Sequence, residues 1–165
     1  MAPVTSGYSR IQIILHWAIA VLVVFQFMGS DTISSLIEQV GLTASSAETI
    51  PLLARAHVIA GILTFVLMLV RVFMRFTKGA PALPKDESAM MKMAAHATHG
   101  ILYLALFLMP ISGAAAWFGQ VELADTVHIT LKFVLLGFVA LHVAAALYHQ
   151  FVLKNGLIKR MMKAG

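Results

Sequence analysis

Long apolar stretches alternate with short polar ones along this chain. A helix that crosses a bilayer needs about 20 mostly apolar residues, because a hydrocarbon core of roughly 30 Å offers the backbone no water. Four stretches meet this requirement, and they lie at residues 11–29, 52–76, 96–118 and 127–153. The pattern therefore predicts four membrane-spanning helices.

The segments between these stretches are polar or contain helix breakers. Residues 31–49 are rich in Ser and Thr and predict an extramembrane loop with at most one short helix. Gly79, Pro81 and Pro84 prevent a continuous helix between the second and third stretches. A short turn at residues 119–126 joins the last two. We expect an all-α, integral membrane, antiparallel four-helix bundle that forms a single domain over residues 1–165.

The first stretch also has to be compared with a cleaved signal peptide. Its apolar run is long, it contains His16 and Trp17, and it has no obvious small-x-small cleavage site. We therefore expect a retained helix.

Composition agrees with a membrane protein. Hydrophobic residues make up 60% of the chain and charged residues 12%, against roughly 45–50% and 25% in soluble proteins. The chain has no cysteine, which excludes disulfides, zinc–thiolate sites, iron–sulfur clusters and covalently attached c-type haem.

The net charge of +5 is explained by topology rather than by nucleic acid. Lys and Arg accumulate in the cytoplasmic flanks of membrane helices. Ten cations fall on one predicted side: Arg10, Arg71, Arg75, Lys78, Lys85, Lys92, Lys154, Lys159, Arg160 and Lys163. Only Arg55 and Lys132 fall on the other, together with five acids. We expect both termini in the cytoplasm and the protein in the bacterial inner membrane.

Seven histidines in so apolar a chain are the main chemical signal. Ionisable side chains inside membrane helices are costly, so each one is a functional candidate. His128 and His142 are 14 residues apart on the fourth helix, close to four turns, which places them on nearly the same face and about 21 Å apart along the axis. Two haems stacked across a bilayer need this arrangement.

The second ligand of each haem has to come from another helix at the matching depth. His16 lies at the inner depth on the first helix, and His57 lies at the outer depth on the second. Neutral imidazole is a standard axial haem ligand and is buried without net charge. The histidines thus predict two haems b.

Other histidines compete for these roles. His149 lies seven residues after His142 on nearly the same face, but pairing it with His128 would put the irons about 31 Å apart, the whole hydrocarbon thickness; we favour His142. His96 and His99 can ligate, bind a haem propionate, relay protons to a quinone, or remain solvated in the interface.

An ordered set of short motifs is similar to the bacterial cytochrome b561 family, small di-haem b proteins of four helices. These motifs are Tyr8-Ser9-Arg10, Leu15-His16-Trp17, His57, His96-Ala97-Thr98-His99, Met109-Pro110-Ile111-Ser112-Gly113, His128, and the run from Leu141 to His149. The resemblance covers nearly the whole chain. It implies His16 with His142 for the inner haem and His57 with His128 for the outer haem.

One branch of the family resembles a superoxide oxidase that reduces ubiquinone near the inner face. On that likeness, Lys85 would bond a quinone oxygen, and His149 would bond or protonate it. A loop charge that follows the positive-inside rule explains Lys85 equally well.

The two outer cations flank the outer ligands. Arg55 lies two residues before His57, and Lys132 lies one turn after His128. They can bind haem propionates, which we favour, or form a cationic entrance for an anion such as superoxide. The five acids of the outer loops oppose the second role, because an anionic substrate is drawn by positive field.

Three functions remain in view. The first is transmembrane electron transfer from an outer donor, such as superoxide, to a quinone. The second is a haem-bearing membrane subunit that docks a separate redox protein, such as a periplasmic donor. The third, a metal-ion or proton transporter, is disfavoured because the helices contain no intramembrane carboxylate path.

Overall fold

The computed structural model describes residues 4–5, 7–40, 52–81 and 87–165, and these are mainly helical. Four long helices are present: α1 (Arg10–Val40), α2 (Leu52–Lys78), α3 (Ala89–Trp117) and α4 (Glu122–Phe151). Each contains a segment long and apolar enough to cross a membrane, in α1 the part Arg10–Gly29. The predicted all-α bundle of four membrane-length helices is confirmed.

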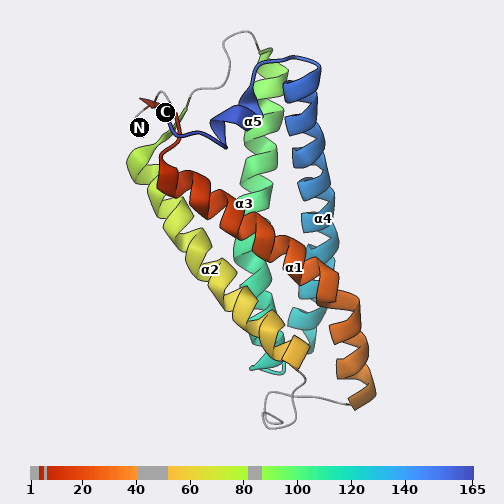
Figure 1. The fold of residues 1–165 in the computed structure, drawn as a ribbon. Helices are drawn as coiled ribbons and strands as arrows, with labels where there is room; N and C mark the ends of the chain where they lie inside the picture. The colour runs from red at the N-terminus through yellow and green to blue at the C-terminus, as the bar shows by residue number, and fades with distance from the viewer. Residues whose placement is uncertain (1–3, 6, 41–51, 82–86) are drawn as a thin grey trace.

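The helices are packed in a chain of neighbours (Figure 1). Helix α3 packs closely on α4, α1 on α2, and α2 on α3. Both termini lie at the end of the bundle where α2 finishes and α3 begins. A small core at mid-height is formed by Ile19, Val23 and Met68, with Tyr103 and Val139 packed against it. The helices therefore hold together around mid-depth.

Several boundaries differ from the sequence-based prediction. Helix α1 continues to Val40, into the segment expected to be a loop, and Figure 1 shows it bending where the red stretch becomes orange. Gly29-Ser30 is the kind of pair at which helices kink. The part of α1 after Gly29 can be polar, because it lies beyond the segment long and apolar enough to span a membrane.

Helix α3 starts at Ala89 instead of residue 96, and ends one residue earlier than the predicted 118. Its N-cap is Ser88, whose hydroxyl accepts a hydrogen bond from the Met91 amide at 3.2 Å. The cap allows two further helical turns before the strongly apolar stretch. His96 and His99 consequently lie inside α3 rather than at its start.

The remaining differences are smaller. Helix α2 ends at Lys78, two residues beyond the predicted 76, and α4 covers Glu122–Phe151 instead of 127–153. A short helix, α5 (Leu157–Arg160), follows it. Two-residue strands β1 (Val4–Thr5) and β2 (Ala80–Pro81) pair in parallel. The hydrophobic pattern of the sequence does not indicate any of these three short elements.

Ser9 and Gln12 form a capping box at the start of α1. The Gln12 amide donates to the Ser9 hydroxyl at 3.3 Å, and the Ser9 amide donates to Gln12 Oε1 at 3.0 Å. Gln12 Nε2 also donates to the Gly79 carbonyl at 2.9 Å, and Arg71 donates to the Gln12 carbonyl at 3.1 Å. These bonds fix the start of α1 against the end of α2.

The turn between α3 and α4 is shorter than predicted. Only residues 118–121 separate the helices, and Gln120 adopts a positive φ of 52°. A side chain at Gly119 would approach the Ala115 carbonyl oxygen to 2.6 Å, so only glycine fits there. The tight turn holds α3 and α4 side by side and antiparallel.

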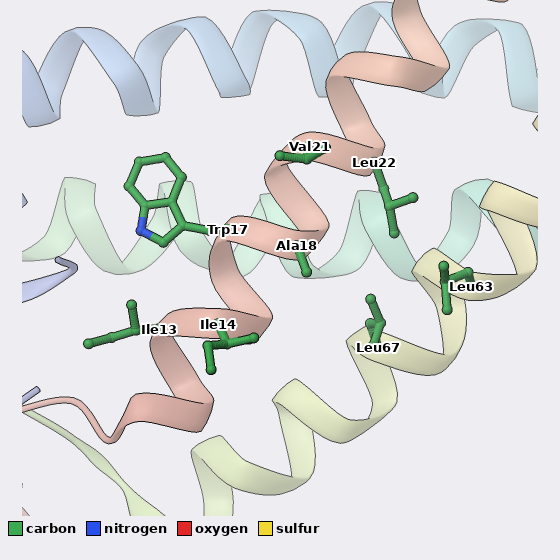
Figure 2. Close-up of a pocket in the computed structure, with 8 residues that line it drawn as sticks. All are labelled: Ile13, Ile14, Trp17, Ala18, Val21, Leu22, Leu63 and Leu67. Carbon is green, nitrogen blue, oxygen red and sulfur yellow. The ribbon is translucent and has the colours of Figure 1, made fainter.

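A shallow groove of about 590 Å³ runs between α1 and α2. Figure 2 shows that its lining is apolar, from Ile13 and Trp17 on α1 to Leu63 and Leu67 on α2. Many other large apolar side chains are exposed along the helices. Such a surface suits contact with lipid, and the groove carries no group for chemistry.

Candidate functional site

Two histidine pairs lie between helices that do not pack closely on each other. His16 on α1 faces His142 on α4, with ring centroids 6.2 Å apart. His57 on α2 faces His128 on α4, also with centroids 6.2 Å apart. Close packing comparable to that of α3 on α4 is absent between α4 and either α1 or α2 over the described helices. The structure thus brings together both pairs that the sequence predicted.

The separation within each pair fits one metal ion between the rings. A metal–imidazole bond of about 2.0 Å, with the bonded nitrogen about 1.15 Å from its ring centroid, places two such centroids about 6.3 Å apart. The observed 6.2 Å in both pairs matches this value. At this spacing, the two imidazoles of each pair could hold one iron ion between them.

The number of side-chain ligands distinguishes a macrocycle from a bare ion. Among the described residues, no group of three or more His, Asp or Glu side chains is arranged to hold a metal ion. A structural or catalytic site for a bare zinc ion typically uses three or four protein ligands. Two axial imidazoles suffice only where the remaining ligands come from a porphyrin, so the donor set fits haem.

Most of α4 is not covered by the other helices. Leu135 is its one buried residue in the structure. Gly137 lies on nearly the opposite face of α4 from the two histidines, and a side chain added there would meet nothing within 4 Å. The 14 residues from His128 to His142 set the sites about 21 Å apart along the helix.

Helix α3 holds the ring of His128 in place. His128 Nδ1 donates to the Met109 carbonyl oxygen at 3.0 Å and lies 3.3 Å from the Ser112 hydroxyl, which itself donates to Met109 at 3.0 Å. With the hydrogen on Nδ1, the lone pair is on Nε2, the nitrogen available to a metal. Gly113 leaves room for the ring: a Cβ there would lie 2.9 Å from His128 Cε1.

The His57–His128 pair has a further polar contact on α1. Gln26 Nε2 donates to the backbone carbonyl of His57 at 3.1 Å. Gln26 Oε1 and His57 Nδ1 are buried and have no hydrogen-bond partner among the described residues. An unpaired ring nitrogen in an apolar setting is costly, which makes His57 a candidate ligand.

His99 joins the inner pair rather than standing alone. Its ring centroid is 5.2 Å from that of His142, and its Nδ1 donates to the Ala95 carbonyl at 2.6 Å. The positive charge of Arg71 acts on His16, His99 and His142. The His99 ring and the charge of Arg71 therefore lie near the His16–His142 pair, while His99, like His96, is an exposed residue.

His149 has different neighbours from the paired histidines. Its Nδ1 lies 2.7 Å from Asn155 Nδ2 and 3.3 Å from Glu87 Oε1. The His149 side chain is 12% exposed and that of Glu87 5%. The polar contacts of His149 are thus with residues that precede α3 and follow α4. The ring that faces His16 is that of His142, not that of His149.

The other candidates lie where the sequence placed them along the helices. Arg55 is exposed in the first turns of α2, and Lys132 is half-buried on α4 with its Nζ 5.2 Å from the Phe133 ring centroid. Lys85 lies outside the described residues. The roles of these three in binding propionate, anion or quinone stay predictions.

Sequence reasoning missed five residues that contact or surround the histidines. These are Gln26, Arg71, Glu87, Ser112 and Asn155. Gln26 could have been noticed as an amide inside an apolar run, and Ser112 as part of the Met109–Gly113 motif. Glu87 and Asn155 lie in polar connections where an acid and an amide are ordinary.

Comparison with known proteins gives consistent matches over almost the whole chain. Residues 7–164 match the family model described as prokaryotic cytochrome b561. The chain is 37% identical to cytochrome b562 of Cereibacter sphaeroides, covering 95% of this chain and 96% of that protein. It is 31% identical to the probable superoxide oxidase CybB of Yersinia pestis, covering 94% and 95%. It is 25% identical to cytochrome b561 homolog 1 of Escherichia coli, covering 94% and 96%.

Proposed function

The chain belongs to the prokaryotic cytochrome b561 family, and from that premise we propose that it passes electrons from a donor at one membrane face, superoxide or a redox protein, to ubiquinone at the other. Family membership itself supports haem-based electron transfer across a bacterial membrane. The two histidine pairs, each with centroids 6.2 Å apart, carry the finer proposal.

We assign His16 and His142 to one haem b and His57 and His128 to a second. When bound, haem b supplies one-electron iron chemistry that the side chains lack. The chain's own contribution is to hold four imidazoles at two depths about 21 Å apart. The carbonyl of Met109 orients His128, and the start of α1, fixed through Gln12, positions His16 one turn later.

The predicted orientation puts the His16–His142 pair near the cytoplasm. Arg71 lies on this side with His99, and its charge favours the arrival of electrons at the inner site. His149 and Lys85 are our candidates for contact with the quinone. We assign Arg55 and Lys132, which are close to His57 and His128 in the sequence, to the haem propionates.

Superoxide is the first donor to test, because a probable superoxide oxidase is among the relatives. Purified, haem-loaded protein is mixed anaerobically with superoxide and ubiquinone-1, and quinol formation is measured. Quinone reduction by the isolated chain supports the proposal. Inertness that a periplasmic redox protein relieves would indicate a docking subunit instead, and a colourless preparation would indicate a transporter.

A further inference from the structure

The segment that follows α4 folds back onto the start of α1. Gly156 adopts a positive φ of 70°, which glycine enters without strain, and the chain turns there into α5, which packs on α4. Further on, the Gly165 amide donates to the Tyr8 carbonyl oxygen at 3.4 Å. Figure 1 shows α5 leading from α4 towards the start of α1. Residues 157–165, which we call the tail segment, therefore connect α4 with α1.

The tail segment contacts α1 through Trp17. The Trp17 indole Nε1–H donates to the Met161 carbonyl oxygen at 2.8 Å, and the two residues are 144 positions apart in the sequence. Met161 is held in turn, because its amide donates to the Ile158 carbonyl at 2.9 Å. Trp17 is 47% exposed, so packing encloses only about half of its surface. The indole has one hydrogen-bond donor, and its bond to the tail segment restricts the rotation of the ring.

Trp17 also lies against one of the candidate haem ligands. Its ring centroid is 5.4 Å from that of His16, and the two rings meet edge to face at an angle of 72°. His16 faces His142, with ring centroids 6.2 Å apart. The Met161 carbonyl, the indole and the two imidazoles thus form a series of neighbouring groups that leads from the tail segment to α4. A rotation of the indole would change the contact on one side of the His16 ring.

The two helices that carry His16 and His142 lack close contact of their own. Among the long helices, over their described residues, the closely packed pairs are α3 with α4, α1 with α2, and α2 with α3. Two axial ligands of one iron have to keep a fixed separation. Without the tail segment, the separation of α1 and α4 would be set only through α2 and α3. The tail segment adds a direct connection, and it reaches α1 at the residue next to His16.

We propose that the tail segment keeps His16 at its ligating distance from His142, and that Trp17 is the positioning residue through which it acts. The inference rests on the proposed function, because that function assigns His16 and His142 to one haem. When the bond to Met161 is broken, the His16 ring is held less firmly and leaves the iron more often. Carbon monoxide binds a six-coordinate haem only after an axial ligand has left. The rate of carbon monoxide binding therefore measures how firmly His16 is held.

Two full-length variants break the same hydrogen bond from its two sides. Trp17→Phe keeps an aromatic ring beside His16 but removes the N–H donor. Met162→Pro turns the Met161 carbonyl away, because Met161 has a ψ of 4° and a residue before proline favours an extended ψ. The matched controls are Met162→Ala, at a side chain that is 71% exposed, and Trp117→Phe, at the far end of α3.

Each protein is loaded with haem, placed in lipid nanodiscs and reduced anaerobically, and carbon monoxide binding is followed by absorbance in stopped flow. From the contribution of one hydrogen bond, we expect one haem to bind carbon monoxide about 2- to 10-fold faster in W17F and in M162P. The second haem and both control variants should match the wild type. Repeating W17F in a His57→Ala background, which is expected to retain only the haem of His16 and His142, identifies the haem that responds.

The double variant W17F/M162P should bind carbon monoxide no faster than the faster single variant, because both changes break one bond. Rates in W17F and M162P equal to the wild type overturn the proposal. So do effects that multiply in the double variant, since Trp17 would then act on His16 without the tail segment. If W17F does not load haem, the comparison of M162P with M162A decides by the same measure. A His57→Ala protein without haem would instead contradict the ligation by His16 and His142, and the proposed function with it.

Discussion

The contact between Gly113 and His128 gives the sharpest prediction about the outer site. In Gly113→Ala the new Cβ would lie 2.9 Å from Cε1 and 3.1 Å from Nδ1 of the His128 ring. Carbon atoms normally approach to about 3.5–4.0 Å, so the ring has to move by roughly 0.6 Å. The Met109 bond is already 3.0 Å long, and this shift would take it beyond hydrogen-bond distance.

The magnitude follows from these two costs. Overpacking costs about 1–3 kcal/mol, and a lost hydrogen bond costs about 0.5–1.5 kcal/mol. When the ring moves, the overpacking is partly relieved but the hydrogen bond to Met109 is lost, so the two costs do not add in full. We therefore expect the free energy of binding the outer haem to weaken by about 2–3 kcal/mol. This corresponds to roughly 30- to 150-fold weaker binding at 1.4 kcal/mol per factor of ten. The inner haem should bind as in the wild type.

Gly100→Ala is the matched control. Gly100 lies on the same helix, and a Cβ there would meet nothing within 4 Å. Both variants share the gain of about 0.5–1 kcal/mol from replacing a helical glycine, so only the contact with His128 separates them. The assay is titration of the apoprotein with haem, followed by potentiometry. A G113A protein that retains both haems at wild-type affinity, or a G100A protein with the same defect, would refute the reasoning.

Substitutions at four further residues test other contacts. His142→Ala should remove one haem and leave the other spectrally intact, as should His57→Ala for the other site; loss of both haems, or of neither, contradicts the pairing. Arg71→Gln should lower the midpoint potential of the inner haem, because a nearby cation favours the reduced form, while Arg71→Lys should stay close to the wild type; a rise on potentiometric titration would be inconsistent with the assigned place of Arg71. Gln26→Leu should destabilise the loaded protein by about 1 kcal/mol through loss of its bond to the His57 carbonyl, and an unchanged Tm would show that this bond contributes nothing.

The fold was predictable from the sequence because the bilayer imposes one length on every spanning helix. Four apolar stretches had to become helices, and short connections had to make neighbours antiparallel. The ends were not predictable from hydrophobicity, since the extension of α1 to Val40 and the early start of α3 at Ala89 lie outside the apolar requirement. The Ser88 cap and the Ser9–Gln12 capping box were readable signals that a hydrophobicity criterion passes over.

The candidate site, like the fold, was predictable from the sequence only in part. The 14-residue spacing of His128 and His142 follows from helix geometry alone, and it predicted which histidines share a face. The contacts of the rings depend on tertiary placement: nothing in the sequence says that the Met109 carbonyl meets His128, or that Arg71 lies beside the inner pair. Glu87 shows the limit most clearly, because a solvated loop acid and a buried one look alike in the sequence until the end of α4 is packed against it.

Ligation of two haems by His16, His57, His128 and His142 is the central claim, and the number of haems per chain tests it most directly. Pyridine haemochrome analysis of the fully loaded, detergent-purified protein, set against protein concentration from amino-acid analysis, gives that number. The account predicts two non-covalently bound haems b per chain. A value of one or less at saturation would contradict it.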